Sequence, residues 1–596
     1  MFSQLTKKQK KILNCPHTRV VVKACPGSGK TFSVAARLAK LLSENTYRHQ
    51  GIAVISFTNV AADEIKRSLS EDYGITKLGY PHFVGTIDSF INKHIFLPFG
   101  HLLMNCKKRP EIVGTEFNPW YEYDPSKRNP HSGKITDADY YFDKVSFDKN
   151  GKLLPLLPYN SYHLKKIDWE NNFTVKGELK KYIHYILNSK KKFFKQGKSN
   201  QADANYFSHK ILKKYPAILN VLAKKFSHII IDEAQDTTDF QMSIIDLVDE
   251  SGIENIMLVG DPNQAIFEWN TADAELFKKK YDNSNYQTID LDENRRSSDN
   301  ICKVLNKMVS GSSTSISDVK NDENIPQVKG YNSDQDIIHI KNDFLKQCEV
   351  LNISVEKSAI LFRGKKFGEE HFQLVTGLLD DPPWENGHYY VRDITHGKYL
   401  TEKGYFKDGL RLLEKGYHKL SDPNLNYVSN KFINEKINEN GFRDYRIKLF
   451  NFIDLLPDTS DKALITWINN TNAILKENGY PILRIKRSRA NIKLCHLFHK
   501  AESSDYPFVI GTIHSVKGQT FDAVLLFLQK RSAKKHYSKL ISAAYNETDL
   551  EKKKKDKEEL RLVYVACSRP KRLLWIAVPT QDKEIWNNHL GLNNSI

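Results

Sequence analysis

The sequence predicts an α/β protein built on two parallel β-sheets. Short apolar runs rich in Ile and Val recur along the chain, and each is followed at once by a polar loop of small residues. The runs show no alternation of apolar and polar residues, which is typical of strands buried on both faces of a parallel sheet. A long stretch without such runs divides them into two sets, so we expect two α/β domains.

The polar loops follow the carboxyl ends of the predicted strands, which is where ligands bind in parallel sheets. With these loops, the runs lie at residues 19–24, 52–59, 228–236 and 255–264 in the first set and at 358–364, 522–529 and 573–578 in the second. Functional residues are therefore expected in the loops rather than in the strands.

Two long stretches lack this pattern of apolar strands followed by polar loops: residues 97–203 and 367–501. Each has the size of an inserted, largely helical domain. Their basic segments KKKFFK at 190–195 and RIKRSR at 484–489 would either contact the phosphates of a nucleic acid duplex or form solvated helix faces, and both alternatives stay open. The run EKKKKDKEEL at 551–560 is expected to be a solvated helix face.

The composition is that of a soluble, multidomain and basic protein. The chain has 596 residues, which is too long for one hydrophobic core. Lys and Arg number 89 against 71 Asp and Glu, which gives a formal net charge of +18. This surplus favours a polyanionic partner, either nucleic acid or an anionic membrane surface, although a lysine-rich, well-solvated surface would give the same count.

The cysteines indicate a reducing compartment. Seven cysteines are scattered without a CxxC pair, which argues against a disulfide scaffold or an iron–sulfur cluster. The segment CHLFH at 495–499 is expected to be part of a helix rather than a metal site. The N-terminus lacks the apolar core of a signal peptide, and no run of about 18 apolar residues occurs. We therefore expect a cytoplasmic protein that does not cross a membrane.

A glycine-rich loop, ACPGSGKT, follows the first predicted strand. Gly27 and Gly29 allow a tight turn that points backbone N–H groups at phosphate oxygens. Lys30 reaches the β- and γ-phosphates, and Thr31 offers its hydroxyl to Mg²⁺. The usual first glycine of this motif is Ala24 here. The expected nucleotide-binding residues of the loop are Ala24, Cys25, Pro26, Gly27, Ser28, Gly29, Lys30 and Thr31.

Two adjacent acids end the predicted strand of IIIDEAQD. Asp232 is placed to hold a metal ion, usually through water, and Glu233 to orient and deprotonate an attacking water. Adjacent acids at a strand end are commonplace, but together with the glycine loop they point to hydrolysis of a Mg²⁺-bound nucleoside triphosphate.

Further segments complete an ordered set of motifs. Along the chain these are LTKKQ, FTNVAADEIKRSL, GTIDSF, DEAQDTTDFQ, VGDPNQAIFEW, LDENRRSSDNI, GTIHSVKGQTFDAVLL and LVYVACSRPKRLL. In these segments the chain resembles the UvrD/Rep/PcrA group of superfamily 1A DNA helicases over most of both α/β domains. The resemblance implies two RecA-like P-loop NTPase domains with parallel sheets, two inserted and mainly helical subdomains, and ATP with Mg²⁺ as cofactors.

The resemblance also implies domain boundaries and roles. Domain 1A would comprise 1–96 and 204–290, inserted domain 1B 97–203, domain 2A 291–366 and 502–596, and inserted domain 2B 367–501. ATP would bind between 1A and 2A, so that arginines of the second domain act on the nucleotide held by the first. The chain after Arg569 would be too short for the nuclease domain that some relatives carry.

Individual roles follow from the same motifs. Gln9 would read the adenine edge and bind ATP, Gln264 would sense the γ-phosphate, and Arg296 and Arg569 would act as arginine fingers. The expected catalytic residues are Lys30, Glu233, Gln264, Arg296 and Arg569, and the expected metal ligands are Thr31 and Asp232.

Two aromatic side chains follow the fourth strand of the first set. Phe267 and Trp269 would be core residues if they were considered alone, but at this position the family stacks rings on successive bases of single-stranded DNA, at roughly 1–3 kcal/mol per base. The resemblance implies further contacts with the single strand, and we call the whole set, including Phe267 and Trp269, the strand track. Its other members are Phe57, Thr58, Asn59, Thr86, Ser89, Thr512, His514, Ser515 and Lys517.

The chain departs from the family pattern at several positions. The tyrosine that stacks on adenine is Arg295 here, and the arginine that follows the glycine-loop threonine is Phe32. Because an aromatic and a guanidinium exchange places, we expect both residues to bind ATP, with the base between them. Thr520 replaces a Glu that binds the nucleotide ribose, so discrimination of the sugar is expected to differ from that of the family. Asp88 replaces a His and Asn270 replaces an Arg, so the contacts with DNA are expected to differ as well.

The sequence therefore favours an ATP-driven 3′→5′ DNA translocase and helicase that binds single-stranded and duplex DNA. The alternative is a DNA-dependent ATPase that serves a partner, such as a nuclease in repair or antiphage defence, and unwinds little alone. An RNA helicase is disfavoured because RNA-directed branches usually vary both DEAQD and QAIFEW. A signalling GTPase would require an NKxD segment and would leave the distal arginines unexplained. The pathway, the protein partner and the oligomeric state stay open.

Overall fold

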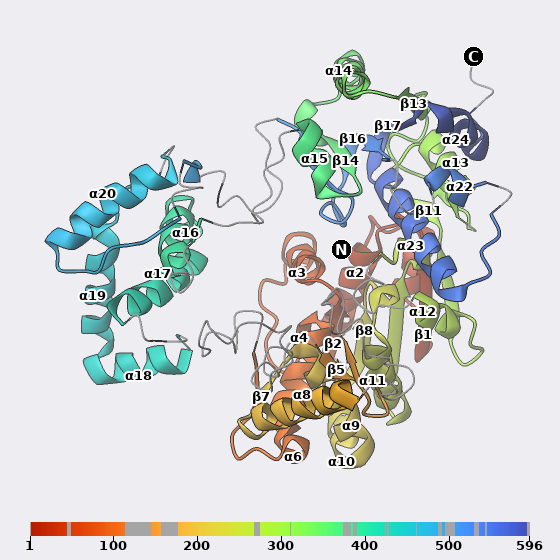
Figure 1. Ribbon diagram of the computed structural model, residues 1–596. Coiled ribbons are helices and arrows are strands. Elements are labelled where there is room, and N and C mark those ends of the chain that lie inside the picture. The colour runs from red at the N-terminus through yellow and green to blue at the C-terminus, as the bar shows by residue number, and fades with distance from the viewer. Residues whose placement is uncertain are drawn as a thin grey trace. The chain divides into compact units, whose positions relative to one another are not determined.

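The computed structural model contains two units (Figure 1). The described residues of the first unit lie within 1–116, 127–364 and 511–596, and those of the second lie within 365–510. The structure describes residues 2–44, 49–113, 145–155, 177–266, 274–309, 311–372, 383–384, 390–422, 425, 428, 430–459, 462–486, 491–494, 497, 507–529, 536–542 and 545–592.

The first unit contains a six-stranded parallel sheet. In spatial order its strands are β10 (Gln287–Leu291), β1 (Arg19–Ala24), β9 (Asn255–Gly260), β8 (Phe226–Ile231), β2 (Gly51–Ser56) and β3 (Phe83–Thr86). Every residue of β2 and β8 is buried, as expected for strands covered on both faces. The helices that accompany this sheet are α1 (Lys7–Leu13), α2 (Lys30–Ser43), α3 (Asn59–Tyr73), α4 (Ile87–Ile91), α10 (Pro216–Lys225), α11 (Asp239–Glu250) and α12 (Ala274–Tyr281).

This unit also contains a second, five-stranded sheet. In spatial order its strands are β13 (Gln327–Tyr331), β17 (Pro570–Pro579), β16 (Phe521–Phe527), β14 (Ser358–Phe362) and β15 (Val509–Thr512). The pairs of β17 with β13 and β16, and of β16 with β14, are parallel. Its helices include α13 (Asp299–Met308), α14 (Asp334–Val350), α22 (Tyr537–Leu540), α23 (Leu550–Cys567) and α24 (Lys583–Leu590), with α13 and α24 beside β17 and β13 (Figure 1).

The two sheets confirm the predicted α/β class, because all seven predicted strands lie in them. Sequence patterns missed β3, β10, β13 and β15, which are the edge strands of the two sheets. The lysine-rich run at 551–560 lies within α23, as expected. A small two-stranded ladder of β11 (Glu293–Asn294) and β12 (Thr314–Ser315) lies in the connection between the large sheets.

A group of short elements lies between β3 and β8. After α4 come a π-helical turn (Asn92–Phe96), α5 (Leu97–Phe99), α6 (His101–Met104), β4 (Glu111–Ile112), β5 (Val145–Phe147), β6 (Leu153–Pro155), α8 (Gly177–Lys195), β7 (Lys198–Ser199) and α9 (Gln201–Lys214). A fully buried ion pair holds them together: Lys190 of α8 contacts Asp203 of α9 at 2.6 Å, and neither side chain is exposed. Ser146 of β5 donates its hydroxyl to the same carboxylate at 2.8 Å.

The second unit is mainly helical in its described residues. Its helices are α15 (Lys365–Phe372), α16 (Tyr390–Glu402), α17 (Phe406–Ser421), α18 (Asn430–Asn440), α19 (Phe442–Leu455) and α20 (Leu464–Glu477). The backbones of α16 and α17 approach closely, because a Cβ on Gly397 would lie 2.8 Å from the carbonyl oxygen of Gly409. Trp467 of α20 is fully buried in the core of this unit and donates its indole N–H to the Pro457 carbonyl.

In the part of the chain that the structure describes, no helix combines the length and apolarity that crossing a bilayer requires.

Removal of the buried lysine should destabilise the first unit. We expect Lys190→Met to lower the free energy of unfolding by about 3–5 kcal/mol, because it leaves the Asp203 carboxylate buried without its cation. Urea unfolding followed by circular dichroism and limited proteolysis would measure this. The control is Lys149→Met, because Lys149 forms a more exposed pair with Asp239 and should change stability by less than about 1 kcal/mol. Equal effects of the two variants would contradict the prediction.

Candidate functional site

Three neighbouring strands of the first sheet carry the candidate site. The glycine loop follows β1, Asp232 and Glu233 follow β8, and Gln264 follows β9, which lies between them. Because carboxyl ends of parallel strands meet at one edge of a sheet, this order brings residues more than 200 positions apart together. The hydroxyl of Thr31 accordingly donates to a carboxylate oxygen of Asp232 at 2.9 Å.

The glycine loop is closely approached by the chain around residue 294. Gly27 and Gly29 have positive φ angles of 68° and 75°, which glycine adopts without strain. A Cβ on Gly27 would lie 2.4 Å from Oδ1 of Asn294, so only glycine fits there. The backbone N–H of Arg295 donates to the Gly27 carbonyl at 2.9 Å. Lys30 begins α2 and is buried.

Gln9 connects this loop to Arg295. Its Nε2 donates to the Ser28 carbonyl at 2.9 Å, and its Oε1 accepts from Nη1 of Arg295 at 3.3 Å. Phe32 is the third residue of α2, and its ring centroid lies 6.2 Å from that of Tyr73. Gln9 therefore supports the loop and the guanidinium, and its contact with adenine stays a prediction.

The donor set around Thr31 fits Mg²⁺. No group of three or more His, Cys, Asp or Glu side chains in the described ranges is arranged to hold a metal on its own. Mg²⁺ bound with a nucleotide usually takes only one or two protein ligands and completes its shell with phosphate oxygens and water. Burial, with the neighbouring Glu233 as a second cause, raises the pKa of Asp232 to about 7, and a bound cation would offset this.

Glu233 is fixed in an uncommon conformation. Its φ of 55° is left-handed, which is rare for a residue other than glycine, and its N–H donates to Oδ1 of Asp232 at 3.0 Å. Burial alone would raise the pKa of Glu233, but Lys30 and Lys517 lower it below its usual value. The carboxylate therefore stays ionised, as acceptance of a proton from water requires.

Two arginines meet at the site: Arg569 is buried and Arg296 is half-buried. Nη2 of Arg569 donates to Oε1 of Gln264 at 2.7 Å, and Nη1 of Arg296 donates to the Ser568 carbonyl at 3.0 Å. Burial lowers the pKa of Arg296 to about 10, and burial together with Arg296 lowers that of Arg569 to about 9. Both stay protonated at neutral pH. Two desolvated guanidinium groups beside a glycine loop fit the phosphates of a nucleotide.

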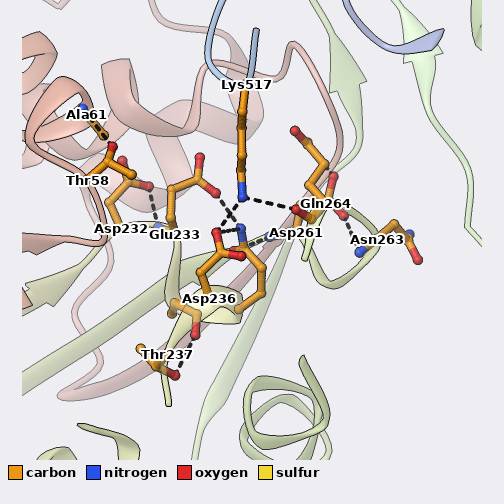
Figure 2. A network of polar contacts seen from close by, with 12 residues as sticks. Thr58, Ala61, Asp232, Glu233, Asp236, Thr237, Asp261, Asn263, Gln264 and Lys517 are labelled. Atoms are coloured by element: carbon orange, nitrogen blue, oxygen red, sulfur yellow. Dashed lines mark hydrogen bonds and ion pairs between the residues drawn. The ribbon is translucent and has the colours of Figure 1, made fainter. Parts of the chain in front are cut away.

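Lys517 joins the acidic side of the site, as Figure 2 shows. It lies in the loop between β15 and β16 of the second sheet, and its Nζ contacts Oδ2 of Asp236 at 2.6 Å and the Gln264 carbonyl at 3.2 Å. Nε2 of Gln264 in turn donates to Asp261 at 2.7 Å. Sequence reasoning expected Lys517 to contact DNA, whereas its ammonium lies among the carboxylates.

The other predicted strand contacts follow the carboxyl ends of β2, β3 and β15. Thr58 caps α3 by accepting from the Ala61 N–H at 3.2 Å, and Thr86 caps α4 in the same way from Ser89. Burial and Arg363 lower the pKa of His514 to about 4, and its Nε2 is buried without a hydrogen-bond partner among the described residues. Phe57 and Ser515 also lie in these loops, whereas Asn59 begins α3 and Thr512 ends β15. The predicted stacking residues Phe267 and Trp269 lie outside the described residues, as does Asn270.

Sequence reasoning missed three contributors. Gln235 and Asp236 lie in the motif DEAQDTTDFQ, but no role was assigned to them. Their contacts, Gln235 with Glu233 and Asp236 with Lys517, first indicate one. Asn294 accepts from the N–H groups of Arg296 and Ser297 at 2.8 and 3.0 Å and thereby shapes the turn against the glycine loop. Its position two residues before the candidate arginine was the available signal.

Two protein-family models match the chain. The UvrD/REP helicase N-terminal domain matches residues 5–285, and the UvrD-like helicase C-terminal domain matches residues 423–581. Together they cover more than half of the 596 residues.

Individual relatives differ in how much of the chain they match. The ATP-dependent DNA helicase Rep of Buchnera aphidicola subsp. Schizaphis graminum is 26% identical over 60% of this chain and 52% of that protein. DNA helicase II of Escherichia coli is 25% identical over 52% of this chain and 41% of that protein. The Gabija protein GajB of Bacillus cereus is 23% identical over 90% of this chain and 92% of that protein.

The chain thus spans about half the length of the Rep and DNA helicase II proteins that it matches. The two matched ranges contain the glycine loop, Asp232, Glu233 and Gln264 in the first and Lys517 and Arg569 in the second, whereas Arg296 lies between them. The chain belongs to the UvrD-like helicase family.

Proposed function

We propose that the protein is an ATP-dependent DNA helicase that translocates along single-stranded DNA with 3′→5′ polarity. The observation that carries the proposal is the contact of Arg569 with Gln264 beside the glycine loop, because it brings groups from both sheets to one nucleotide site. Membership of the UvrD-like helicase family supports DNA as the polymer, and polarity is taken from the resemblance of the motifs.

In this proposal each charged group of the site has a task during hydrolysis. Lys30 binds the β- and γ-phosphates, and Thr31 with Asp232 holds the Mg²⁺ that neutralises developing charge on the transferred phosphoryl group. Glu233 orients the attacking water and takes its proton. Arg296 and Arg569 stabilise the charge of the transition state. Gln264 senses the γ-phosphate and couples its presence to the strand track.

Movement would follow from the two-sheet construction. ATP links the glycine loop of the first sheet to arginines near the second, so loss of the γ-phosphate removes a bridge between them. The strand track would consist of the loops after β2, β3 and β15, together with Phe267 and Trp269. Stacking on aromatic rings tolerates any base, which suits a motor that moves along arbitrary sequence.

A second candidate function is a DNA-dependent ATPase that serves a partner such as a nuclease in antiphage defence. The alignment with the Gabija protein GajB supports it, because that alignment covers 90% of this chain and 92% of that protein. Coverage alone does not separate the two candidates, since a probable DNA helicase II homolog of Mycoplasma genitalium aligns over 97% of this chain and 85% of that protein. Strand displacement by the purified chain, with and without co-purified proteins, separates the two. Unwinding by the chain alone supports the helicase, and ATP hydrolysis without unwinding supports the second candidate.

Loss of the catalytic carboxylate should abolish turnover while nucleotide binding is retained. We expect Glu233→Gln to reduce the DNA-stimulated kcat by about 10²–10⁴-fold, because an amide cannot accept the proton of the attacking water. A phosphate-release assay and ATP titration would measure both effects. Glu250→Gln, at the exposed end of α11, is the matched control and should behave as wild type. A Glu233→Gln enzyme with full activity would contradict the proposed chemistry.

Arg569, which immediately precedes β17, should act on the rate and not on DNA affinity. We expect Arg569→Lys to lower kcat by about 10³-fold, because lysine cannot reproduce a guanidinium that contacts Gln264 and a phosphate together. Arg572→Lys serves as control, since Arg572 pairs with Asp322 at 2.7 Å. Steady-state kinetics and DNA binding by fluorescence anisotropy would distinguish the variants. Equal losses in both would mean that the effect is structural.

The exchanged aromatic should bind the adenine base. We expect Phe32→Ala to raise the KM for ATP by about tenfold, as loss of one stacked ring predicts, with DNA affinity unchanged. Phe2→Ala is a close control, because Phe2 also packs against Tyr73, with ring centroids 5.6 Å apart. An unchanged KM in Phe32→Ala would exclude a base held between Phe32 and Arg295.

A further inference from the structure

Lys517 is the one predicted strand contact whose charged group the structure places among the carboxylates of the nucleotide site (Figure 2). Its side chain is only 13% exposed, and that of Asp236 is 1% exposed. The ammonium also contacts the Gln264 carbonyl, three residues before Phe267. Lys517 therefore connects a loop of the second sheet with two loops of the first.

Gln235 connects Asp236 to the carboxylate of Glu233. Its side chain is fully buried, and its Nε2 donates both to Glu233 and, at 3.1 Å, to Oδ2 of Asp236. Its Oε1 accepts from the Asp261 N–H at 3.0 Å. Gly260 leaves room for this, since a Cβ there would lie 2.6 Å from Oε1. The amide is thereby held at both ends and shares its two hydrogens between two carboxylates.

These contacts form a continuous chain from the second sheet to the reacting atoms. Lys517 contacts Asp236, Gln235 contacts Asp236 and Glu233, and Glu233 would contact the attacking water. Lys517 and Gln235 meet on the same oxygen of Asp236. Withdrawal of the ammonium would leave Gln235 as the side-chain donor to that oxygen, and a stronger bond to Asp236 would draw the amide away from Glu233.

We propose that Lys517, Asp236 and Gln235 are positioning residues that set the orientation of the Glu233 carboxylate, so that the placement of the β15–β16 loop controls the rate of ATP hydrolysis. The same loop carries His514 and Ser515, which are proposed strand contacts, so an occupied strand track would act on Glu233 through Lys517. The inference rests on the proposed function and deepens it, because it names how the strand regulates the nucleotide site. It also assigns Lys517 a role other than binding a DNA phosphate.

The test compares variants that break the chain at successive contacts: Lys517→Met, Asp236→Asn, Gln235→Met and the double variant Lys517→Met/Asp236→Asn. We expect each single variant to lower the DNA-stimulated kcat by about 10–100-fold, with KM for ATP and affinity for an oligo-dT strand unchanged. The double variant should lose no more than either single variant, since both remove one shared contact. Kinetics at saturating oligo-dT and anisotropy titrations over a range of salt would measure these quantities.

A matched ion pair elsewhere in the first unit provides the control. Lys280 contacts Asp246 at 2.8 Å and is 17% exposed, close to the exposure of Lys517. Lys280→Met should leave kcat, KM and strand affinity at the wild-type values. Thermal unfolding identifies any variant that fails to fold, and in that case the isosteric Asp236→Asn carries the test.

Different results would overturn different statements. If Asp236→Asn keeps the wild-type kcat while Lys517→Met weakens oligo-dT binding and flattens its salt dependence, Lys517 is a strand contact and the inference is wrong. If the double variant loses the product of the single losses, the residues act independently and the chain of contacts is not a functional unit. If wild type shows DNA-stimulated hydrolysis and no variant changes it, the inference alone fails. If wild type hydrolyses no ATP, the proposed function fails together with it.

Discussion

The requirement that buried charges be compensated determines how this site is built. Desolvated ions are stable in a protein interior only when they are paired and hydrogen-bonded. The site holds buried carboxylates at Asp232, Asp236 and Asp261, a half-buried one at Glu233, and positive charges at Lys30, Arg296, Lys517 and Arg569. The carboxylates all follow strands of the first sheet, whereas Lys517 and Arg569 come from the second. Neither sheet alone would balance the charge of the assembled site.

The order of the strands in the first sheet brings the acids together, and the close approach of two backbone segments brings an arginine to them. The adjacent strands β1, β9 and β8 place the glycine loop, Gln264 and the acids along one edge. Glycine at position 27 then lets the turn after β10 lie directly on the loop, so that Arg296 reaches the site from the connection between the sheets. The arrangement of the candidate site thus depends on a position where a side chain would collide with Asn294.

The sequence predicted the interior of each sheet well and the edges poorly. Strands such as β2 and β8 are buried throughout, so their apolar runs were unmistakable. The edge strand β10 has only five residues, of which three are exposed, and such segments resemble loops in sequence. Motif order located the glycine loop, the acids and both arginines. It did not locate Gln235, because nothing in a glutamine's identity tells which carboxylates its amide will contact.

Charge compensation across the sheets also explains why such a site is sensitive to movement. Two unit charges 4 Å apart interact by on the order of 4 kcal/mol at the effective dielectric constant typical of partly exposed pairs. Coupling between distant sites usually amounts to only about 1–3 kcal/mol. A shift of a few ångströms in a single lysine between the sheets is therefore large enough to account for communication between a strand and a nucleotide. The pairing that allows Asp236 to be buried beside Glu233 makes that acid dependent on a residue of the opposite sheet. The motor proposed above would need this dependence, because an active site complete within one sheet would hydrolyse ATP whether or not the other sheet had moved.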